Sequence, residues 1–359
     1  MSELRTKRQE EFATKWINNG KFGILNLAPR FGKCRTTINI LNKLKPKEIL
    51  IAYPDNKIRD SWISEFDEMN YNAENVTYTT HLSLHKHQDV EFDLVVIDEI
   101  HLLSEAQIEA AKLLLSNNKS VLGLTGTLSR WTEETLAEEL DMLVVAEYPI
   151  SLAVEEGVVV DYEIIVHTTS LDNQTINDYK GKKRTEKKQF DAYTWTITML
   201  ERSRQNSMFL RLARMRIVQN SLAKQTLTKN LLQKYKDERV LVFCGVTKTS
   251  DALGIPSYHS KSTEKNVFDS FVKGETNHLA VVKIGNSGVT YKSLNRLIIN
   301  YFDSNAENLA QKINRCMGFE YNNPDKKAYI HIISTNESVE LKWLNKALEF
   351  FDPNKIKYV

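Results

Sequence analysis

Short runs of consecutive hydrophobic residues alternate along the chain with stretches in which hydrophobic positions recur at helical spacing. Uninterrupted apolar runs are typical of strands buried on both faces, and the amphipathic stretches between them are typical of covering helices. The alternation predicts an α/β fold built from parallel sheets with helices on both sides. In the first part of the chain we expect strands at residues 24–27, 49–53, 94–97 and 121–124, followed by a helix at 133–140.

A second set of strands follows a polar break at Glu155-Glu156-Gly157. Its expected members are residues 162–166, 240–243, 279–283, 297–300 and 329–333. We therefore place a domain boundary near residue 158, between an N-terminal lobe of residues 1–158 and a C-terminal lobe of residues 159–359. A chain of 359 residues has room for two domains of about 150 residues each and an insertion.

The composition is that of an ordinary globular protein, with 42% hydrophobic and 26% charged residues. The cysteines, Cys34, Cys244 and Cys316, are odd in number and far apart, which predicts a reducing compartment without structural disulfides. No apolar run approaches the roughly 18 residues of a membrane span, and residues 1–11 are too polar for a secretory leader. We expect a cytoplasmic monomer without a membrane partner.

Positive charge is concentrated in one segment. The formal net charge is only +2, but residues 180–216 hold eleven Lys or Arg against three acidic residues. The aromatic residues among these cations are Phe190, Tyr193, Trp195 and Phe209. Such a mixture suits phosphates and stacked bases, so we expect a helical basic insertion at about 175–236, with Lys182, Lys183 and Arg184 on nucleic acid. We expect Trp195 to pack in the interior, and the alternative for the whole segment is a solvated helical face.

Residues 28–34, Ala-Pro-Arg-Phe-Gly-Lys-Cys, have the form of a phosphate-binding loop. They follow an apolar run at 23–27 and precede a stretch with the spacing of a helix start, which is the context that such a loop requires. Backbone N–H groups at the helix N-terminus would face the phosphates, and the ammonium of Lys33 would contact the β and γ oxygens.

Residues 95–101, Val-Val-Ile-Asp-Glu-Ile-His, place a pair of acids at the end of an expected strand. Asp98 would hold Mg²⁺, usually through water, and Glu99 would polarise the attacking water. Either motif alone is explained by an ordinary loop or a solvated acid pair. Their order, together with an apolar strand and small-residue turn at 121–127, argues against coincidence. His101 has no second His or Cys at ligand spacing nearby, so a metal site there is rejected.

In this order the motifs resemble those of superfamily 2 helicases and translocases of the DEAD/DEAH-box type. The compact length is similar to phage-encoded members, which implies the cytoplasm of a bacterial cell or of a phage-infected host. The resemblance covers about residues 4–335. Two further segments resemble nucleic-acid motifs of the family: residues 49–54, with Trp62 and Phe66 on the following helix, and residues 76–84. Segments of the second half that resemble family motifs are residues 240–244, 286–290 and 311–315.

The resemblance implies two RecA-like lobes that bind ATP and Mg²⁺ between them. The nucleotide-binding residues implied are Gln9, which would read adenine, and Arg30, Phe31, Gly32, Lys33, Cys34, Arg35 and Gly288. The catalytic residues implied are Lys33, Asp98, Glu99, Gln311 and the arginine finger Arg315. His101 would couple the nucleotide site to the second lobe through Gln311, and the alternative is a satisfied core histidine. The nucleic-acid contacts implied are Pro54, Thr79, Thr80, Phe243 and Thr290.

The chain departs from the family pattern at three positions. Arg30 stands where the loop normally has Gly, Cys34 where it has a hydroxyl residue, and Gly318 where the finger motif has a second Arg. A thiol is a poor ligand for Mg²⁺, so a metal contact would be lost or replaced by water, unless Thr36 or Thr37 compensates. A slow or silent ATPase is therefore an alternative.

Taken together, the sequence predicts an ATP-dependent DNA helicase or branch-migration translocase that acts on single-stranded or branched DNA. An RNA helicase shares every motif, because the strand contacts are mainly to the backbone. A motor subunit of a larger machine is also compatible. A nucleic-acid-binding scaffold with an impaired ATPase is the alternative from a different class.

Overall fold

The computed structural model describes residues 2–179, 181–262, 266–282, 291–318, 320, 323 and 325–359. The chain divides into two compact units, which we describe separately. The first contains the residues up to Asp161, with Met317 and Gly318, and the second contains most of the residues from Tyr162 onward. None of the helices in these ranges combines the length and apolar character needed to span a bilayer.

The first unit is built on a six-stranded parallel sheet with the order β3-β2-β4-β5-β1-β6. Its strands are β1 (Phe22–Leu27), β2 (Ile49–Tyr53), β3 (Val76–Thr80), β4 (Leu94–Asp98), β5 (Val121–Thr125) and β6 (Val144–Tyr148). The four predicted strands are the four central ones, and every residue of β2, β4 and β5 is buried. The edge strands β3 and β6 were not predicted, because half-exposed strands lack a continuous apolar run.

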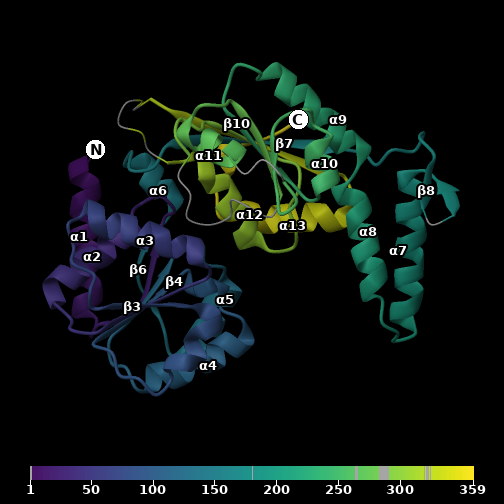
Figure 1. The fold of residues 1–359 in the computed structure, drawn as a ribbon. Helices are drawn as coiled ribbons and strands as arrows, with labels where there is room; N and C mark the ends of the chain where they lie inside the picture. Colours follow the sequence, from purple (N-terminus) through teal and green to yellow (C-terminus); the bar gives the residue numbers. More distant parts are fainter. Residues whose placement is uncertain are drawn as a thin grey trace. The chain divides into compact units, whose positions relative to one another are not determined.

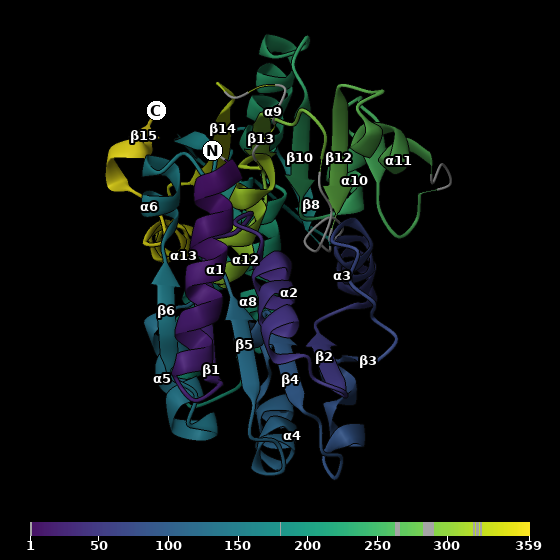
Figure 2. The same cartoon turned by 90° about the vertical axis from the view of Figure 1, so that its left-hand side faces the viewer.

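Helices cover both faces of this sheet, as the alternating pattern predicted (Figures 1 and 2). One face carries α1 (Ser2–Asn18), α2 (Lys33–Leu44) and α3 (Asn56–Glu68), and the other carries α4 (Glu105–Ser116) and α5 (Arg130–Leu140). The remaining helical segments are α6 (Ile150–Glu155) and the 3₁₀ turns η1 (His81–His87) and η2 (Ile100–Leu102). Ile108, Leu114 and Leu136 of α4 and α5 pack with Val95 and Ile97 of β4 in one buried cluster.

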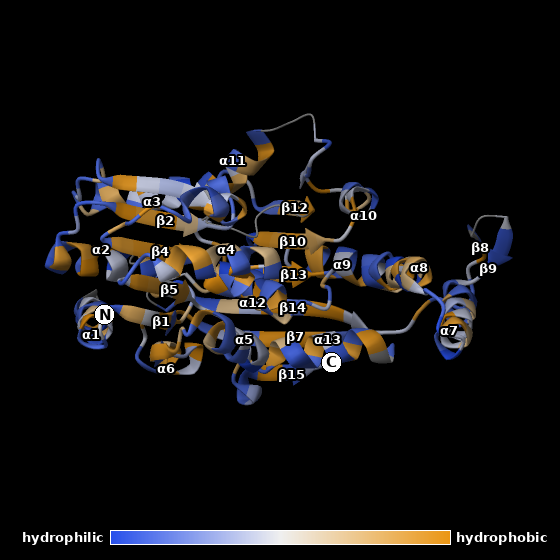
Figure 3. Cartoon of the chain, turned by 90° about the horizontal axis from the view of Figure 1, so that it is seen from below, coloured by the Kyte–Doolittle hydropathy of each residue, from blue (hydrophilic) through white to orange (hydrophobic). Residues whose placement is uncertain are grey.

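The second unit contains a seven-stranded sheet with the order β11-β12-β10-β13-β14-β7-β15, and each strand pair with a described register is parallel. Its strands are β7 (Asp161–Thr169), β10 (Val240–Cys244), β11 (Ser257–Tyr258), β12 (His278–Val282), β13 (Arg296–Ile299), β14 (Lys327–Thr335) and β15 (Ile356–Tyr358). These include all five predicted strands; Lys283 lies outside the described residues. The short strands β11 and β15 were not predicted. Figure 3 shows that the long strands of both units are largely hydrophobic.

Helices α9 (Leu222–Lys234), α10 (Thr247–Asp251), α11 (Asn266–Lys273), α12 (Ala306–Ile313) and α13 (Ser338–Leu348) connect these strands, with the short turns η3 (Asn314–Cys316) and η4 (Pro353–Lys355). Leu231 and Leu232 of α9 pack with Val240 and Val242 in the core of the second sheet. Helix α9 is therefore part of the lobe itself. The insertion was predicted to extend to about residue 236, but in the structure it ends before Leu222.

The inserted segment between β7 and α9 contains a β-hairpin and two helices, which Figure 1 shows beside the sheet of the second unit. The elements are β8 (Asn177–Tyr179), β9 (Lys182–Arg184), α7 (Glu186–Arg202) and α8 (Met208–Gln219). Leu171, Phe190, Ile217 and Val218 form its own small apolar cluster. The prediction that Lys182, Lys183 and Arg184 lie on a helix is wrong. They form an antiparallel strand after a turn in which Gly181 has a φ of 82°, a conformation that favours glycine.

Candidate nucleotide site and nucleic-acid interface

The candidate residues of the first unit gather at one edge of its sheet. The phosphate loop follows β1, Pro54 follows β2, and Thr80 and Asp98 end β3 and β4. Because all these strands are parallel, their carboxyl ends meet at the same edge, where open α/β sheets bind ligands. The fold thus brings together the first-lobe motifs that are separated in the sequence.

The phosphate loop has the backbone shape of an anion cradle. Arg30 and Gly32 have φ angles of 68° and 105°, and Gly32 caps the N-terminus of α2 without a side-chain hydrogen bond. This φ of Gly32 is one that residues with a side chain rarely adopt, and a Cβ atom there would lie 2.5 Å from Nε2 of Gln9, so the position favours glycine. The first turn of α2 contains no acidic residue. Its uncapped N–H groups and positive dipole end therefore suit a phosphate, and the residues present fit a bound nucleotide.

Two buried side chains fix the loop to the rest of the unit. The ring of Phe31 packs between those of Phe12 and Tyr148, with ring centroids 5.7 and 4.9 Å away. Nε2 of Gln9 donates to the backbone carbonyl of Phe31 at 3.0 Å, and Gln9 is only 4% exposed. Gln9 and Phe31 therefore determine the shape of the loop, and contact of Gln9 with adenine stays a prediction.

Arg35 does not direct its guanidinium toward the phosphate loop. Its Nε donates to Glu65 at 2.8 Å and its terminal nitrogen to Glu68 at 2.6 Å, both on α3. The side chain therefore links α2 to α3, and only the backbone N–H of Arg35 stays a candidate for nucleotide binding.

Lys33 and Glu99 form an ion pair at the centre of the site. Nζ of Lys33 lies 2.6 Å from Oε1 of Glu99, and both side chains are largely buried. Burial alone would lower the pKa of Lys33, but the nearby carboxylates of Glu99 and Asp98 outweigh it and raise the pKa. Glu99 has a φ of 51°, which is uncommon for a residue with a side chain. The amine is thus held fully charged beside the acid pair.

Asp98 is held more rigidly than its neighbour. Its Oδ2 accepts a hydrogen bond from Nε1 of Trp62 at 3.0 Å, and its Oδ1 accepts one from the backbone N–H of Glu99 at 3.0 Å. Burial raises the pKa of Asp98 to about 6, although Lys33 and these donors oppose the rise. Sequence reasoning missed this role of Trp62. Trp62 and Phe66, which accompany the motif at 49–54, are buried, at 0% and 1% exposed, so their side chains pack inside the unit.

The hard oxygen ligands for magnesium here are carboxylates, and the motif assigns the ion to that of Asp98. Burial raises the pKa of the Cys34 thiol well above its usual value, so the group is a neutral, soft thiol. The hydroxyls of Thr36 and Thr37 are buried and donate to the carbonyls of Gly32 and Lys33, and compensation by either stays a prediction. Within the described residues no group of three or more His, Cys, Asp or Glu can hold a metal ion. The donor set fits a magnesium ion held by Asp98 through water.

His101 connects the acid pair to the turn after β5. Its Nδ1 lies 2.9 Å from Oγ1 of Thr125 and 3.5 Å from Oε2 of Glu99. The hydroxyl of Thr125 in turn donates to the carbonyl of Thr127 at 3.1 Å. The side chain of His101 is fully buried. Within the first unit, His101 is thus a buried link between Glu99 and the turn at 125–127.

The predicted nucleic-acid contacts of the lobes differ in exposure. Pro54 and Thr80 are half-buried at the ends of β2 and β3, whereas Thr79 is only 5% exposed. Phe243 is 3% exposed within β10, and its carbonyl accepts the N–H of Asn300 at 3.0 Å inside the sheet. The prediction that Phe243 contacts nucleic acid is therefore wrong, and Phe243 is a core residue.

In the second unit, Gln311 lies on α12 and Arg315 in η3, and both are half-buried. Gly288 and Thr290 lie outside the described residues. A Cβ atom at Gly318 would meet no heavy atom within 4 Å, so packing does not explain the absence of an arginine there. The roles of Gln311 and Arg315 stay predictions.

The inserted segment presents cations and large apolar side chains to solvent. Lys182 and Lys183 are exposed on β9. Trp195 of α7 is 65% exposed, so the prediction that it packs in the interior is wrong. Phe209 of α8 is 85% exposed, whereas Phe190 belongs to the small core. Proteins that bind single-stranded nucleic acid combine cations for the phosphates with exposed aromatic rings for the bases, and this surface has both.

Comparisons with known proteins agree with this arrangement. Residues 223–319 match the helicase conserved C-terminal domain. The structure is similar to that of S. cerevisiae Dbp5 bound to RNA and ADP BeF3, with a TM-score of 0.61, 10% sequence identity, and coverage of 98% of this chain and 88% of that one. A variant of Dbp5 with the same ligands gives a TM-score of 0.62, 11% identity and coverage of 98% and 89%.

A search of curated proteins finds no match to the chain. The solved structures show the fold, two tandem RecA-like units, and the segment that matches the helicase conserved C-terminal domain begins in α9 of the second unit. Together these findings support the resemblance to superfamily 2 helicases of the DEAD/DEAH-box type that the motifs indicated.

Proposed function

We propose that this protein is a nucleic-acid-dependent ATPase that works as a helicase or translocase. The observation that carries the proposal is the Lys33–Glu99 ion pair beside the uncapped N-terminus of α2. A phosphate cradle, a charged amine and two acids at one sheet edge are the components of phosphoryl transfer to water. The helicase C-terminal domain match and the Dbp5-like fold favour a motor over other ATPases.

The ion pair suggests how nucleotide binding prepares the acid. Phosphates at the N-terminus of α2 would compete with Glu99 for the ammonium of Lys33. Glu99 would then be free to orient and polarise water, while Asp98, fixed by Trp62 and a backbone N–H, would hold Mg²⁺ through water. The ion, when bound, neutralises phosphate charge. We propose that Arg315 and Gln311 take the finger and coupling roles that the resemblance implies.

The inserted segment supplies the proposed nucleic-acid surface, together with Pro54 and Thr80. Residues 170–221 contain eleven Lys or Arg and five acidic residues, a net charge of +6 in a chain whose total is +2. Neutralisation of phosphates by such cations gives binding that is insensitive to sequence and sensitive to salt. Exposed Trp195 and Phe209 would stack on unpaired bases.

We propose single-stranded or branched DNA as the substrate, on the similarity of this compact chain to phage-encoded motors. RNA is the second candidate, since both Dbp5 structures contain RNA. A scaffold with an impaired ATPase is the third, because Cys34 and Gly318 depart from the family pattern.

One assay distinguishes these candidates: ATP hydrolysis without nucleic acid and with single-stranded DNA, single-stranded RNA, forked duplexes and four-way junctions. A DNA motor is expected to hydrolyse ATP at least about tenfold faster with DNA than with RNA, which is a difference of roughly 1.4 kcal/mol. The reverse preference would identify an RNA helicase. Turnover no faster than that of Glu99→Gln with any polymer would contradict the ATPase and leave the scaffold.

A further inference from the structure

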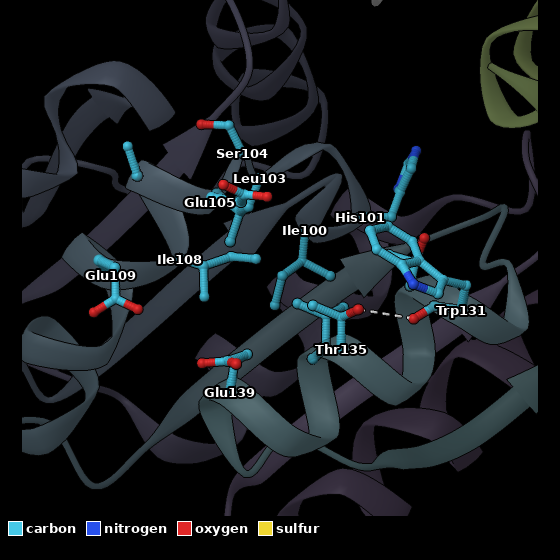
Figure 4. A pocket seen from close by; sticks show the side chains of 13 residues that line it. Ile100, His101, Leu103, Ser104, Glu105, Ile108, Glu109, Trp131, Thr135 and Glu139 are labelled. Atoms are coloured by element: carbon cyan, nitrogen blue, oxygen red, sulfur yellow. Dashed lines mark hydrogen bonds between the residues drawn. The ribbon is translucent and has the colours of Figure 1, made fainter. Parts of the chain in front are cut away.

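A cavity of about 650 Å³ lies in the first unit, on the face of the sheet that α4 and α5 cover. Ile100, Ile108 and Leu136 form its apolar floor, and each is at most 8% exposed. Figure 4 shows Ile100 of η2, Ile108 of α4 and Thr135 of α5 around one space. Trp131, at the start of α5, lines the same cavity with 72% of its surface exposed. A solvent-facing apolar hollow beside a large exposed ring is a typical anchor site for a partner side chain.

The surroundings of the cavity are acidic. Glu105, Glu109 and Glu139 line it, and Lys112 pairs with the last two. Helices α4 and α5 together carry six glutamates against Lys112 and Arg130, a net charge of −4 in a chain whose total is +2. This charge opposes nucleic acid and nucleotides and favours a cationic occupant.

We propose that this cavity docks a basic peptide segment of a partner protein. The segment would place one apolar side chain on Ile100, Ile108 and Leu136 and its Lys or Arg residues against the glutamates of α4 and α5. An amphipathic helix with cations beside its apolar face meets both requirements. The site goes beyond the proposed function, because it is separate from the phosphate loop and does not need ATP.

A docked segment would lie against the turn that follows the acid pair. Ile100 and His101 of η2 line the cavity and come directly after Asp98 and Glu99. His101 also bonds to the hydroxyl of Thr125. A partner bound here would therefore contact the segment that links the acids to the turn at 125–127.

The probe for the test is a fluorescein-labelled synthetic peptide of roughly 12 residues, three helical turns, with leucine on one face and lysine on the other. Its anisotropy is titrated with the full chain without nucleotide, so the result does not depend on ATPase activity. We expect saturable binding to the unmodified chain. Thr135→Trp, which fills the cavity, and Glu109→Lys with Glu139→Lys should each raise the Kd at least about tenfold.

The matched control reverses Glu133 and Glu138, two exposed glutamates of α5 that do not line the cavity. Glu133→Lys with Glu138→Lys should change the Kd by less than about threefold, because charges outside the contact are screened by salt. Equal losses in the two double variants, or equal binding of a scrambled peptide without an apolar face, would overturn the proposal. So would self-association of the chain that Thr135→Trp abolishes, because the occupant would then be a second copy. The charge-reversal pair changes only exposed residues, so it tests the site even if Thr135→Trp does not fold.

Discussion

Asp98 and Glu99 are adjacent in sequence but are held differently. Both oxygens of Asp98 accept hydrogen bonds, from Trp62 and from a backbone N–H, whereas Glu99 pairs with the ammonium of Lys33 and lies 3.5 Å from Nδ1 of His101. A carboxylate fixed on both oxygens suits a ligand that keeps its place. A carboxylate whose partner can move to a phosphate suits a group that acts on water.

Variants of Lys33 and Glu99 are therefore expected to lose different properties. Lys33→Ala should weaken nucleotide binding as well as turnover, because it removes the cation that phosphates attract. Glu99→Gln should keep nucleotide affinity but lower the hydrolysis rate by at least about 100-fold, the lower range for loss of a positioned base. Binding of a fluorescent ATP analogue and steady-state hydrolysis measure the two effects. Near-normal turnover in Glu99→Gln would contradict the assignment.

Cys34 offers a test of the metal arrangement. The neutral thiol is a poor magnesium ligand, and Thr36 and Thr37 donate to carbonyls of their own helix. Cys34→Thr should therefore lower the Mg²⁺ concentration needed for half-maximal hydrolysis, because a hard oxygen replaces sulfur. Cys34→Ser provides a matched hydroxyl without the extra methyl group. An unchanged magnesium requirement in both variants would show that water already fills this position.

At the scale of elements, the inserted segment differs from what its charge pattern suggested. Its lysine-rich run forms one strand of a two-stranded hairpin, and α7 and α8 pack through a cluster of only a few buried residues. A two-stranded ribbon without a large core contributes little to the stability of the molecule. Its cations can therefore be removed without unfolding the lobe.

Because the hairpin contributes little to stability, its cations can be tested by substitution. Replacing Lys182, Lys183 and Arg184 by Ala should weaken nucleic-acid binding for unrelated sequences. The slope of log affinity against log salt should become shallower by up to about two units if all three contact phosphates of a single strand. The melting temperature and the hydrolysis rate without nucleic acid should not change. Equal affinity and equal slope would assign the strand to a merely solvated surface.

The sequence predicted the central strands and the phosphate loop, but not the edge strands or the hydrogen-bond partners of the site residues. Strands β2, β4 and β5 are apolar throughout, whereas β3 and β6 are half-exposed and lack that signal. The loop could be recognised because its chemistry is local in sequence. The bond from Trp62 to Asp98 joins residues 36 positions apart, so no local pattern reveals it. Phe243 was misassigned because a motif resemblance does not report burial.

At the scale of the whole molecule, we expect low pH to lower the free energy of unfolding. His331 on β14 gives one reason. Its Nδ1 lies 2.9 Å from Nε2 of His167, and its Nε2 lies 2.8 Å from a guanidinium nitrogen of Arg296. Burial, with help from Arg296, lowers the pKa of His331 to about 3. The unfolded chain, with an ordinary histidine pKa near 6.5, binds the proton first as the pH falls.

Stability from this histidine is therefore complete above pH of about 6.5 and is lost as the pH falls toward the folded pKa, at up to about 1.4 kcal/mol per pH unit. The free energy of unfolding, measured with urea at pH 7.5 and at pH 5.5, should differ less between the two pH values in His331→Gln than in the unmodified chain. Glutamine keeps hydrogen-bonding capacity but does not titrate. The same pH difference in both proteins would show that other groups control acid sensitivity.

The left-handed backbone of Glu99 is a local source of strain at the proposed catalytic acid. A residue with a side chain at a φ of 51° costs about 1 kcal/mol relative to glycine. Glu99→Gly should therefore be more stable than Glu99→Ala by roughly that amount, because both lose the ion pair but only glycine relaxes the backbone. Thermal unfolding of the two variants measures the difference, and equal stability would contradict it. If it is found, the chain keeps a strained backbone at Glu99 that glycine would relax, and the role proposed for the carboxylate would account for the glutamate at this position.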